Sequence, residues 1–256
     1  MTLVIGINCG DGVVIGSDSM ATTTDPINRS VNIQQYSTKV HIYDSKVIVG
    51  VSGSVGMCQL QLDSLQGQWH SSVLRRDKNA AKQFIADTTF KVTQPYIERS
   101  RAFHNGRIDD SLITALMVAA PLRTGPVLLE FDHQKAVEEK NEEIYFQALG
   151  SGAPMAYPFL KFIDKIFWKG KPPPTISDGV FGVLWTLHHV IDANAMMGVG
   201  GPPQVAVLEK DEKDKWNART LLDEELQEHQ QSIVAAEQSL RDYKKNLKPP
   251  PVDLNS

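Results

Sequence analysis

The segment Thr2-Leu-Val-Ile-Gly-Ile-Asn-Cys9 is followed by Gly10-Asp-Gly12 and then by Val13-Val-Ile-Gly-Ser-Asp18. The two outer segments are short apolar runs rich in β-branched residues, which are typical of strands. Gly and Asp tolerate the positive φ angles of tight turns, so the middle segment predicts a hairpin. The chain is therefore expected to begin with a pair of antiparallel strands.

Hydrophobic periodicity predicts the remaining elements. The expected strands are 40–42, 47–51, 112–120, 127–131, 144–148 and 203–209. The expected helices are 55–73, 79–103 with Pro95 kinking or splitting it, 154–169 and 178–192. The order is strands, two helices, strands, two helices and a strand. This order predicts a layered α+β domain with both sheet faces covered.

The last part of the chain predicts a further amphipathic helix. Its apolar face consists of Leu222, Leu226, Ile233, Leu240, Tyr243 and Leu247. Acidic residues at its start and lysines at its end suit the helix dipole, and Pro249-Pro250-Pro251 ends it. The helix either packs on its own domain or contributes to a subunit interface. We expect a main domain over 1–217 and a C-terminal helix with a Pro-rich tail over 218–256.

Composition excludes several classes of protein. The 256 residues are 41% hydrophobic and 22% charged, as in an ordinary globular protein. The net charge of −4 argues against a nucleic-acid partner, and no apolar run reaches the roughly 18 residues of a membrane span. The N-terminus lacks the basic region of a signal peptide, and two cysteines are too few for a disulfide framework or a zinc site. We expect a cytoplasmic protein without membrane or nucleic-acid partners and without a metal or organic cofactor.

Common nucleotide and hydrolase motifs do not account for the chain. Gly10-Asp-Gly12 with Gly16 joins two strands, whereas a dinucleotide fingerprint joins a strand to a helix. The sequence contains no Walker A motif and no GxSxG elbow.

Thr2 is the candidate nucleophile. Methionine aminopeptidases remove Met1 when a small residue follows, and the mature chain would then carry a hydroxyl and an α-amine on one residue. An α-amine has a pKa near 7.7–8.0, well below the value near 10.4 of a lysine, so it can act as a base at neutral pH. A threonine with its own N-terminal amine is a known activated nucleophile.

Segments in order along the chain resemble proteasome β-type subunits. They are the opening strand with its Asp11-Gly-Val-Val turn, Asp18, Ser37-Thr-Lys-Val-His-Ile42, Val51-Ser-Gly-Ser-Val-Gly56 and Leu149-Gly-Ser-Gly152. The resemblance spans about 2–208. Gly200-Gly-Pro-Pro203 and the long C-terminal helix are closer to the bacterial branch of the family, the betaproteobacterial homologue and ancestral β-subunit types.

The resemblance implies the four-layer αββα sandwich of N-terminal nucleophile hydrolases, with a C-terminal helical extension, and a threonine-type peptidase or amidase. The implied catalytic residues are Thr2 as nucleophile, Lys39 lowering the pKa of its hydroxyl, Asp18 as counter-charge, Gly53 as oxyanion donor, Ser151 orienting the Thr2 amine and Asp192 as a supporting aspartate. The serine that accompanies this aspartate in the family has no clear counterpart here. Without catalysis, the Asp18–Lys39 pair would be exposed, Gly53 a turn glycine and Ser151 a helix N-cap.

The resemblance also implies how substrate would bind. Ala21, Val51 and Val55 would line a small apolar pocket with His41 near its floor, and the main chains of Thr22 and Gly53 would pair with an extended peptide. At Gly53 a side chain would obstruct the substrate carbonyl.

The family pattern implies a homo-oligomer of twelve or fourteen copies, as a ring or a helical stack that encloses the sites, and leaves an unfoldase partner undefined. Candidate contact residues are Leu60 on the first helix and Trp168, Trp185 and Met197. The alternatives are a catalytically silent ring-forming scaffold and a small-molecule amidase of the same nucleophile class.

Overall fold

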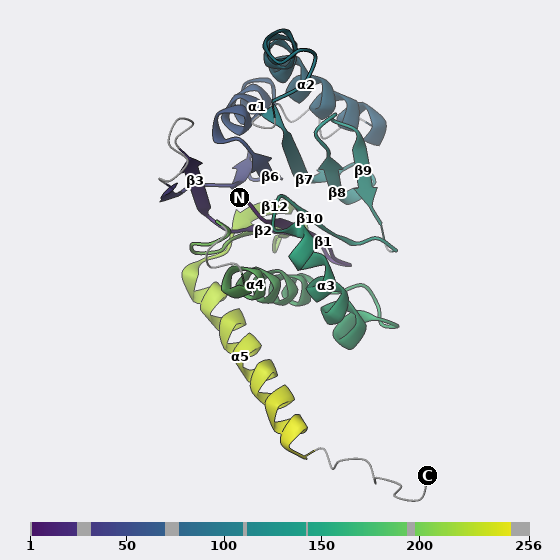
Figure 1. Ribbon diagram of the computed structural model, residues 1–256. Helices are drawn as coiled ribbons and strands as arrows, with labels where there is room; N and C mark the ends of the chain where they lie inside the picture. The colour runs from purple at the N-terminus through teal and green to yellow at the C-terminus, as the bar shows by residue number, and fades with distance from the viewer. Residues whose placement is uncertain are drawn as a thin grey trace, which may run out of the picture.

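The computed structural model describes residues 2–24, 32–69, 77–109, 112–141, 143–193 and 198–246. In this part of the chain, two five-stranded antiparallel sheets face each other between two layers of helices (Figure 1). The expected four-layer αββα arrangement is confirmed.

The first sheet has the order β10-β1-β2-β11-β12. Its strands are β1 Val4–Asn8, β2 Val13–Ser17, β10 Phe146–Leu149, β11 Gln204–Lys210 and β12 Trp216–Thr220. The opening hairpin is confirmed, because β1 pairs antiparallel with β2 from Val4 opposite Ser17 to Asn8 opposite Val13. The boundary expected after residue 217 falls inside β12.

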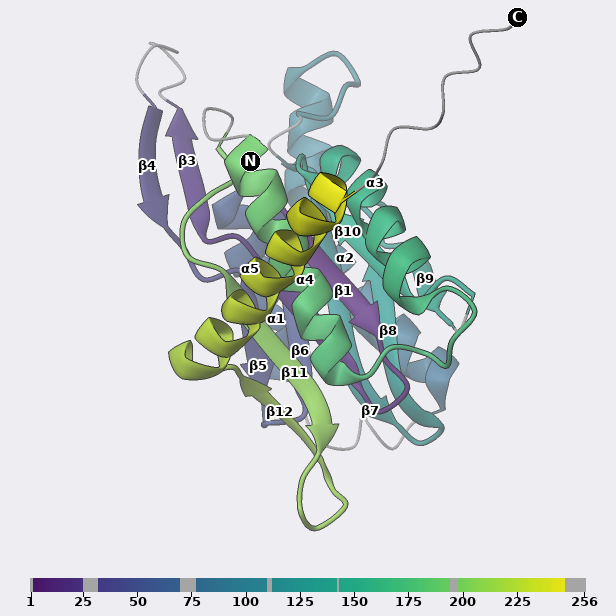
Figure 2. The ribbon, with the colours of Figure 1, turned by 90° about the horizontal axis from the view of Figure 1, so that it is seen from below.

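The second sheet has the order β5-β6-β7-β8-β9, and a separate two-stranded ribbon, β3-β4, stands beside the sheets (Figure 2). The strands are β3 Met20–Thr24, β4 Asn32–Tyr36, β5 Val40–Tyr43, β6 Val47–Gly53, β7 Thr114–Leu122, β8 Gly125–Phe131 and β9 Val137–Lys140. Hydrophobic periodicity did not predict β3, β4, β9 and β12. The first two form the separate ribbon and the last two are sheet edges, so their polar residues carry little of the apolar pattern of a buried strand.

The helices cover the outer face of each sheet. The second sheet is covered by α1 Val55–Gln68 and α2 Lys78–Phe103, and the first by α3 Ala153–Ile163, its π-helical continuation η3 Asp164–Trp168, and α4 Ile176–Ala193. Pro95 does not split α2. Pro95 has no backbone N–H to donate to the carbonyl one turn earlier. Because Pro95 is exposed, that carbonyl can bond to water instead. Residue 73, the expected end of the first helix, lies outside the described residues.

The hydrophobic core fills the spaces between the layers. Val4 packs between the sheets with Ile48 and Leu128, whereas Ile5 and Ile7 on the same strand face α3 and α4. Both faces of β1 are therefore buried, which explains its continuous apolar sequence. Trp168 and Trp185 also belong to this core, so the expectation that they add interface surface is wrong. Met197 lies outside the described residues.

The helix α5, Asp223–Asn246, extends away from the body of the molecule (Figure 1). Its middle packs against α4, where Ile233 is buried and Trp185 Nε1 donates a hydrogen bond to Glu237 Oε1 at 3.1 Å. Farther along the same stripe, Leu240 and Tyr243 are 45% and 66% exposed. The helix therefore packs on its own domain and leaves the end of its apolar stripe uncovered.

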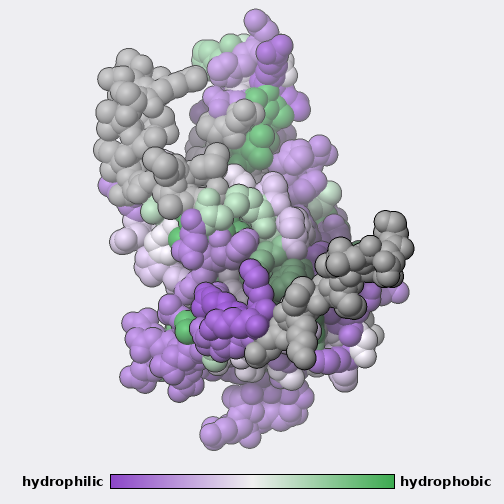
Figure 3. Space-filling view, turned by 60° about the horizontal axis from the view of Figure 1, so that its bottom comes forward, coloured by the Kyte–Doolittle hydropathy of each residue, from purple (hydrophilic) through white to green (hydrophobic). Residues whose placement is uncertain are grey.

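No helix in the described ranges combines the length and the apolar character needed to span a bilayer. The face in Figure 3 is largely hydrophilic, with hydrophobic patches between the polar side chains.

Candidate active site

Thr2 lies two residues before the start of β1 and lines a pocket between the two sheets. Its backbone nitrogen donates a hydrogen bond to Ser151 Oγ at 3.2 Å, and its carbonyl accepts one from Gly152 N at 3.1 Å. Gly150 has a φ of +91°, and a Cβ on it would lie 2.2 Å from Thr2 O. The loop between β10 and α3 therefore holds both backbone polar groups of Thr2 and admits only glycine at position 150.

A buried ion pair lies beside Thr2. Lys39 Nζ is 2.8 Å from Asp18 Oδ1, with side chains 6% and 0% exposed, and it also donates to Met20 O at 2.6 Å. Burial lowers the pKa of Lys39, and the Asp18 carboxylate opposes that shift. The reading of Asp18 and Lys39 as an exposed pair is therefore wrong.

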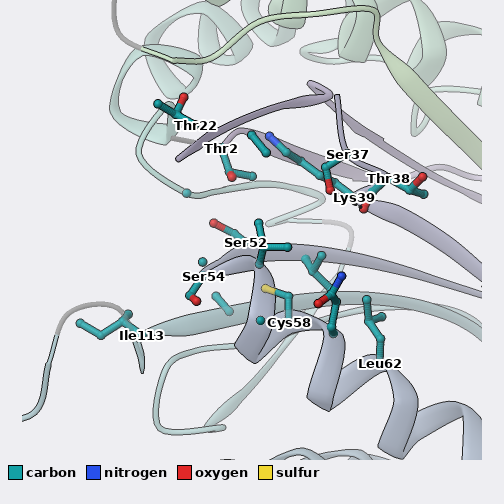
Figure 4. Close-up of a pocket in the computed structure, with 18 of the residues that line it drawn as sticks. Thr2, Thr22, Ser37, Thr38, Lys39, Ser52, Ser54, Cys58, Leu62 and Ile113 are labelled. Carbon is teal, nitrogen blue, oxygen red and sulfur yellow. Dashed lines mark hydrogen bonds between the residues drawn. The ribbon is translucent and has the colours of Figure 1, made fainter. Parts of the chain in front are cut away.

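Asp18 also connects the ion pair to the strand that carries Thr2. Its Oδ1 accepts a hydrogen bond from Leu3 N at 2.9 Å, and its Oδ2 accepts one from Gly200 N at 3.1 Å. The residue following Thr2 and the ammonium of Lys39 therefore share one carboxylate oxygen. Figure 4 shows the Lys39 side chain extending towards Thr2 along one wall of the pocket.

Gly53 ends β6 in the same pocket with a φ of +134°. A Cβ there would lie 2.4 Å from Ile113 O and 2.9 Å from Thr114 Cα. The steric need for glycine therefore comes from the close approach of β7. This differs from the expectation that a side chain would mainly obstruct the substrate.

The pocket has a volume of about 1040 Å³. All six expected substrate-binding residues line it: Ala21, Thr22, His41, Val51, Gly53 and Val55. Hydroxyl groups from Ser37, Thr38, Ser52 and Ser54 line it as well, and Cys58 and Leu62 on α1 reach its wall (Figure 4). The residues expected to form a small apolar pocket therefore line part of a larger cavity, to whose wall turns and strand ends add polar side chains.

Two further titratable groups line the pocket. His41 Nε2 lies 3.2 Å from Thr38 O, and burial lowers the pKa of His41. Burial therefore favours the neutral form of this imidazole. Burial raises the pKa of Cys58 to about 11, which keeps its thiol protonated and poorly nucleophilic.

Asp192 lies apart from the pocket residues. Its side chain is exposed near the end of α4, and it is not among the residues that line the pocket. Ser151, in contrast, is brought directly to Thr2. It does not cap α3, whose N-cap is Gly152.

Gln204, to which no sequence motif assigned a role, forms hydrogen bonds with the backbone around Lys39. A single glutamine at a strand start carries no recognisable sequence signal. Among the described residues, no group of three or more His, Cys, Asp or Glu side chains is placed to hold a metal ion.

This architecture, with a threonine at a strand end beside a buried Lys–Asp pair, is the fold of an N-terminal nucleophile hydrolase. The sequence model described as "Proteasome subunit" matches residues 2–163, and the chain belongs to that family.

Similar proteins agree with this assignment. The chain is 28% identical over 199 residues to a proteasome subunit beta of Methanosarcina thermophila, covering 77% of this chain and 82% of the relative. It is 26% identical over 227 residues to that of Methanococcus aeolicus, covering 89% and 90%.

Solved structures share the fold. The helical assembly of the Anbu complex from Pseudomonas aeruginosa aligns with a TM-score of 0.70 at 18% identity, over 99% of this chain and 100% of the other. Anbu (ancestral beta-subunit) from Yersinia bercovieri aligns with a TM-score of 0.71 at 12% identity, over 98% and 100%. Both structural neighbours are of the bacterial branch named in the sequence analysis.

Proposed function

We propose that this chain is a threonine-type hydrolase of peptide bonds, with Thr2 as its nucleophile after Met1 is removed. The observation that carries the proposal is the position of Thr2 in a large pocket beside the buried Lys39–Asp18 pair. The ammonium favours the alkoxide form of a nearby hydroxyl, so it lowers the pKa of that hydroxyl. Removal of Met1 converts the Thr2 backbone nitrogen into an α-amine, and Ser151 Oγ is already bonded to this nitrogen.

The proposed reaction has two steps. Thr2 Oγ attacks the scissile carbonyl while its proton passes to the α-amine, and the Gly53 N–H stabilises the resulting oxyanion. The amine then gives the proton to the leaving nitrogen, so the C–N bond breaks and an ester to Thr2 Oγ forms. Water attacks this ester, the amine takes a proton from the water, and that proton returns to Thr2 Oγ. The second step releases the acid product and regenerates the enzyme. Asp192 would support this site only from outside the pocket.

An extended peptide fits the pocket walls. Thr22 and Gly53 lie at strand positions where main-chain groups can pair with a peptide, as in β-strand addition. Ala21, Val51 and Val55 supply apolar contacts for a substrate side chain, and His41 lines the same pocket.

We also propose that identical subunits enclose the site in a ring or helical stack of twelve or fourteen copies in the cytoplasm. The structural neighbour from Pseudomonas aeruginosa forms a helical assembly, which supports self-association. Within this chain, Leu240 and Tyr243 on α5 offer exposed apolar contacts. Lateral contacts between identical copies close into a ring or continue as a helix, depending on the rotation between subunits.

The test combines intact mass, native mass spectrometry and turnover of fluorogenic peptides. The proposal expects the mass to lack one methionine, an oligomer of many copies, and hydrolysis that a Thr-directed covalent inhibitor stops. A retained Met1 with no turnover would instead support the ring-forming scaffold. Hydrolysis of small amides without any hydrolysis of peptides would support the small-molecule amidase.

A further inference from the structure

Gln204, the first residue of β11, connects the two sides of the active-site ion pair. Its Oε1 accepts hydrogen bonds from Lys39 N at 2.8 Å and from Val40 N at 3.3 Å. Its Nε2 donates a hydrogen bond to Ser37 O at 2.8 Å. Both ends of one amide side chain therefore hold the backbone that carries Lys39.

The strand that begins at Gln204, β11, also pairs with β2, the strand that precedes Asp18. In the antiparallel pairing of β11 with β2, Gln204 lies opposite Ser17, the residue before Asp18. Just before β11, Gly200 N donates to Asp18 Oδ2 at 3.1 Å, and Gly200 O accepts from Met20 N at 2.9 Å. The segment from Gly200 to Gln204 therefore contacts both partners of the ion pair.

This connection matters because the two charged residues come from different parts of the fold. Asp18 follows β2 in the first sheet, whereas Lys39 precedes β5 in the second. The distance between them depends on how the sheets sit on each other, and a long lysine side chain could otherwise adopt other rotamers. The amide of Gln204 spans this gap with directional hydrogen bonds.

We propose that Gln204 is a positioning residue that sets the Lys39 ammonium against Asp18 and Thr2. It acts through Lys39 alone, because it is not among the residues that line the pocket. The inference rests on the proposed hydrolase function for its kinetic consequence and on the geometry alone for its effect on Lys39.

The kinetic test compares Gln204→Leu with Gln147→Leu, a matched control in which a half-buried strand glutamine is lost from β10. Misplacing a catalytic group costs up to about 100-fold in rate, so Gln204→Leu should lower kcat by about 10- to 100-fold. KM should stay within about twofold, because substrate does not touch this residue. An unchanged kcat, or equal losses in both variants, would overturn the inference.

A pH profile separates positioning from a general structural role. In Gln204→Glu, an ionised carboxylate can still accept from Lys39 N but faces the carbonyl of Ser37 without a proton. The protonated carboxyl has one acceptor and one donor, as the amide does. The ratio of variant to wild-type kcat should therefore rise as the pH falls from 7.5 towards 5. A ratio that does not change with pH would count against the inference.

A second readout needs no hydrolysis. An amine-reactive reagent, followed by peptide mass analysis, measures the reactivity of Lys39 relative to the buried Lys140 in the same protein. Gln204→Leu should raise this ratio several-fold, and Gln147→Leu should leave it unchanged. If wild-type protein does not hydrolyse peptides while this ratio changes as expected, the proposed function fails and the positioning role stands. An unchanged ratio in Gln204→Leu would overturn the positioning role itself.

Discussion

The backbone nitrogen of Thr2 bonds Ser151 Oγ at 3.2 Å, although 149 positions separate the two residues in the sequence. The serine is available for this contact because α3 begins only at Ala153, with Gly152 as its N-cap. A loop after β10 therefore orients the nitrogen that would serve as the base.

Thr2→Ala should abolish peptide hydrolysis and leave assembly intact, because it removes the hydroxyl of a half-buried strand-end residue with little packing role. Thr2→Ser should keep part of the activity, since a hydroxyl and an amine both remain. Fluorogenic turnover and native mass spectrometry measure the two effects. Wild-type turnover in a Thr2→Ala preparation free of host peptidases would disprove the mechanism.

Asp18→Ala should cost activity and about 3–5 kcal/mol of unfolding free energy, because it leaves a buried ammonium without its partner. Lys39→Met should also abolish activity but destabilise less. Asp18 would keep the backbone donors Leu3 N and Gly200 N. Chemical denaturation of both variants measures this asymmetry, and an unchanged midpoint for Asp18→Ala would show that the pair adds no stability.

Gly53→Ala should inactivate the protein and lower its stability by about 1–3 kcal/mol, because a Cβ at φ +134° would strain the backbone and strike Ile113 O. The matched control is Gly67→Ala within α1, where a Cβ would meet nothing within 4 Å. Gly67→Ala should raise the unfolding free energy by at most about 1 kcal/mol, because alanine has a higher helix propensity than glycine. Thermal melts with parallel turnover assays test both, and equal stability of the two variants would contradict the steric argument.

Neither cysteine should react with iodoacetamide at pH 7.5 in the native protein. Burial raises the pKa of Cys58 to about 11 and raises that of Cys9 further, so little thiolate is present. Peptide mass analysis should find both cysteines labelled after unfolding in denaturant. Fast native labelling of Cys58 would mean that its thiol is exposed to the pocket as a thiolate.

Lys135 should make stability depend on pH above neutrality. It is buried, donates to Thr114 O and Oγ1, and burial lowers its pKa to about 8, against about 10.4 in an unfolded chain. Between these values the unfolded state binds more protons, so the unfolding free energy rises with pH.

The test compares the unfolding free energy of wild type with that of Lys135→Met, so that the contribution from the lowered pKa of Lys39 cancels. Between pH 7.5 and 10, the unfolding free energy of wild type should rise relative to that of Lys135→Met by at most about 3 kcal/mol. Denaturant melts at each pH provide the measurement, and parallel curves would show that Lys135 does not titrate in this range.

Local patterns predicted most of the buried elements. The apolar runs of β1 and β2 and the Gly-Asp-Gly turn between them were recognisable because both strand faces are buried. The ribbon β3-β4 and the edge strands β9 and β12 were missed, because their largely polar sequences lack the apolar pattern of a buried strand and only backbone pairing defines them. The two tryptophans were misplaced at an interface, since periodicity alone does not say whether an aromatic faces a neighbouring helix or another subunit.

Local patterns of residues were enough to predict the layered fold class and to place a threonine at the start of the first strand, because strand and helix periods and turn residues are local properties. Three features depend on long-range packing: Asp18 and Lys39 are buried together, Gly53 must be glycine because β7 lies against it, and Gln204 holds the Lys39 backbone. Each of these contacts joins residues distant in the chain. Their distances are set by how one sheet packs on the other, and no local pattern of residues carries that information.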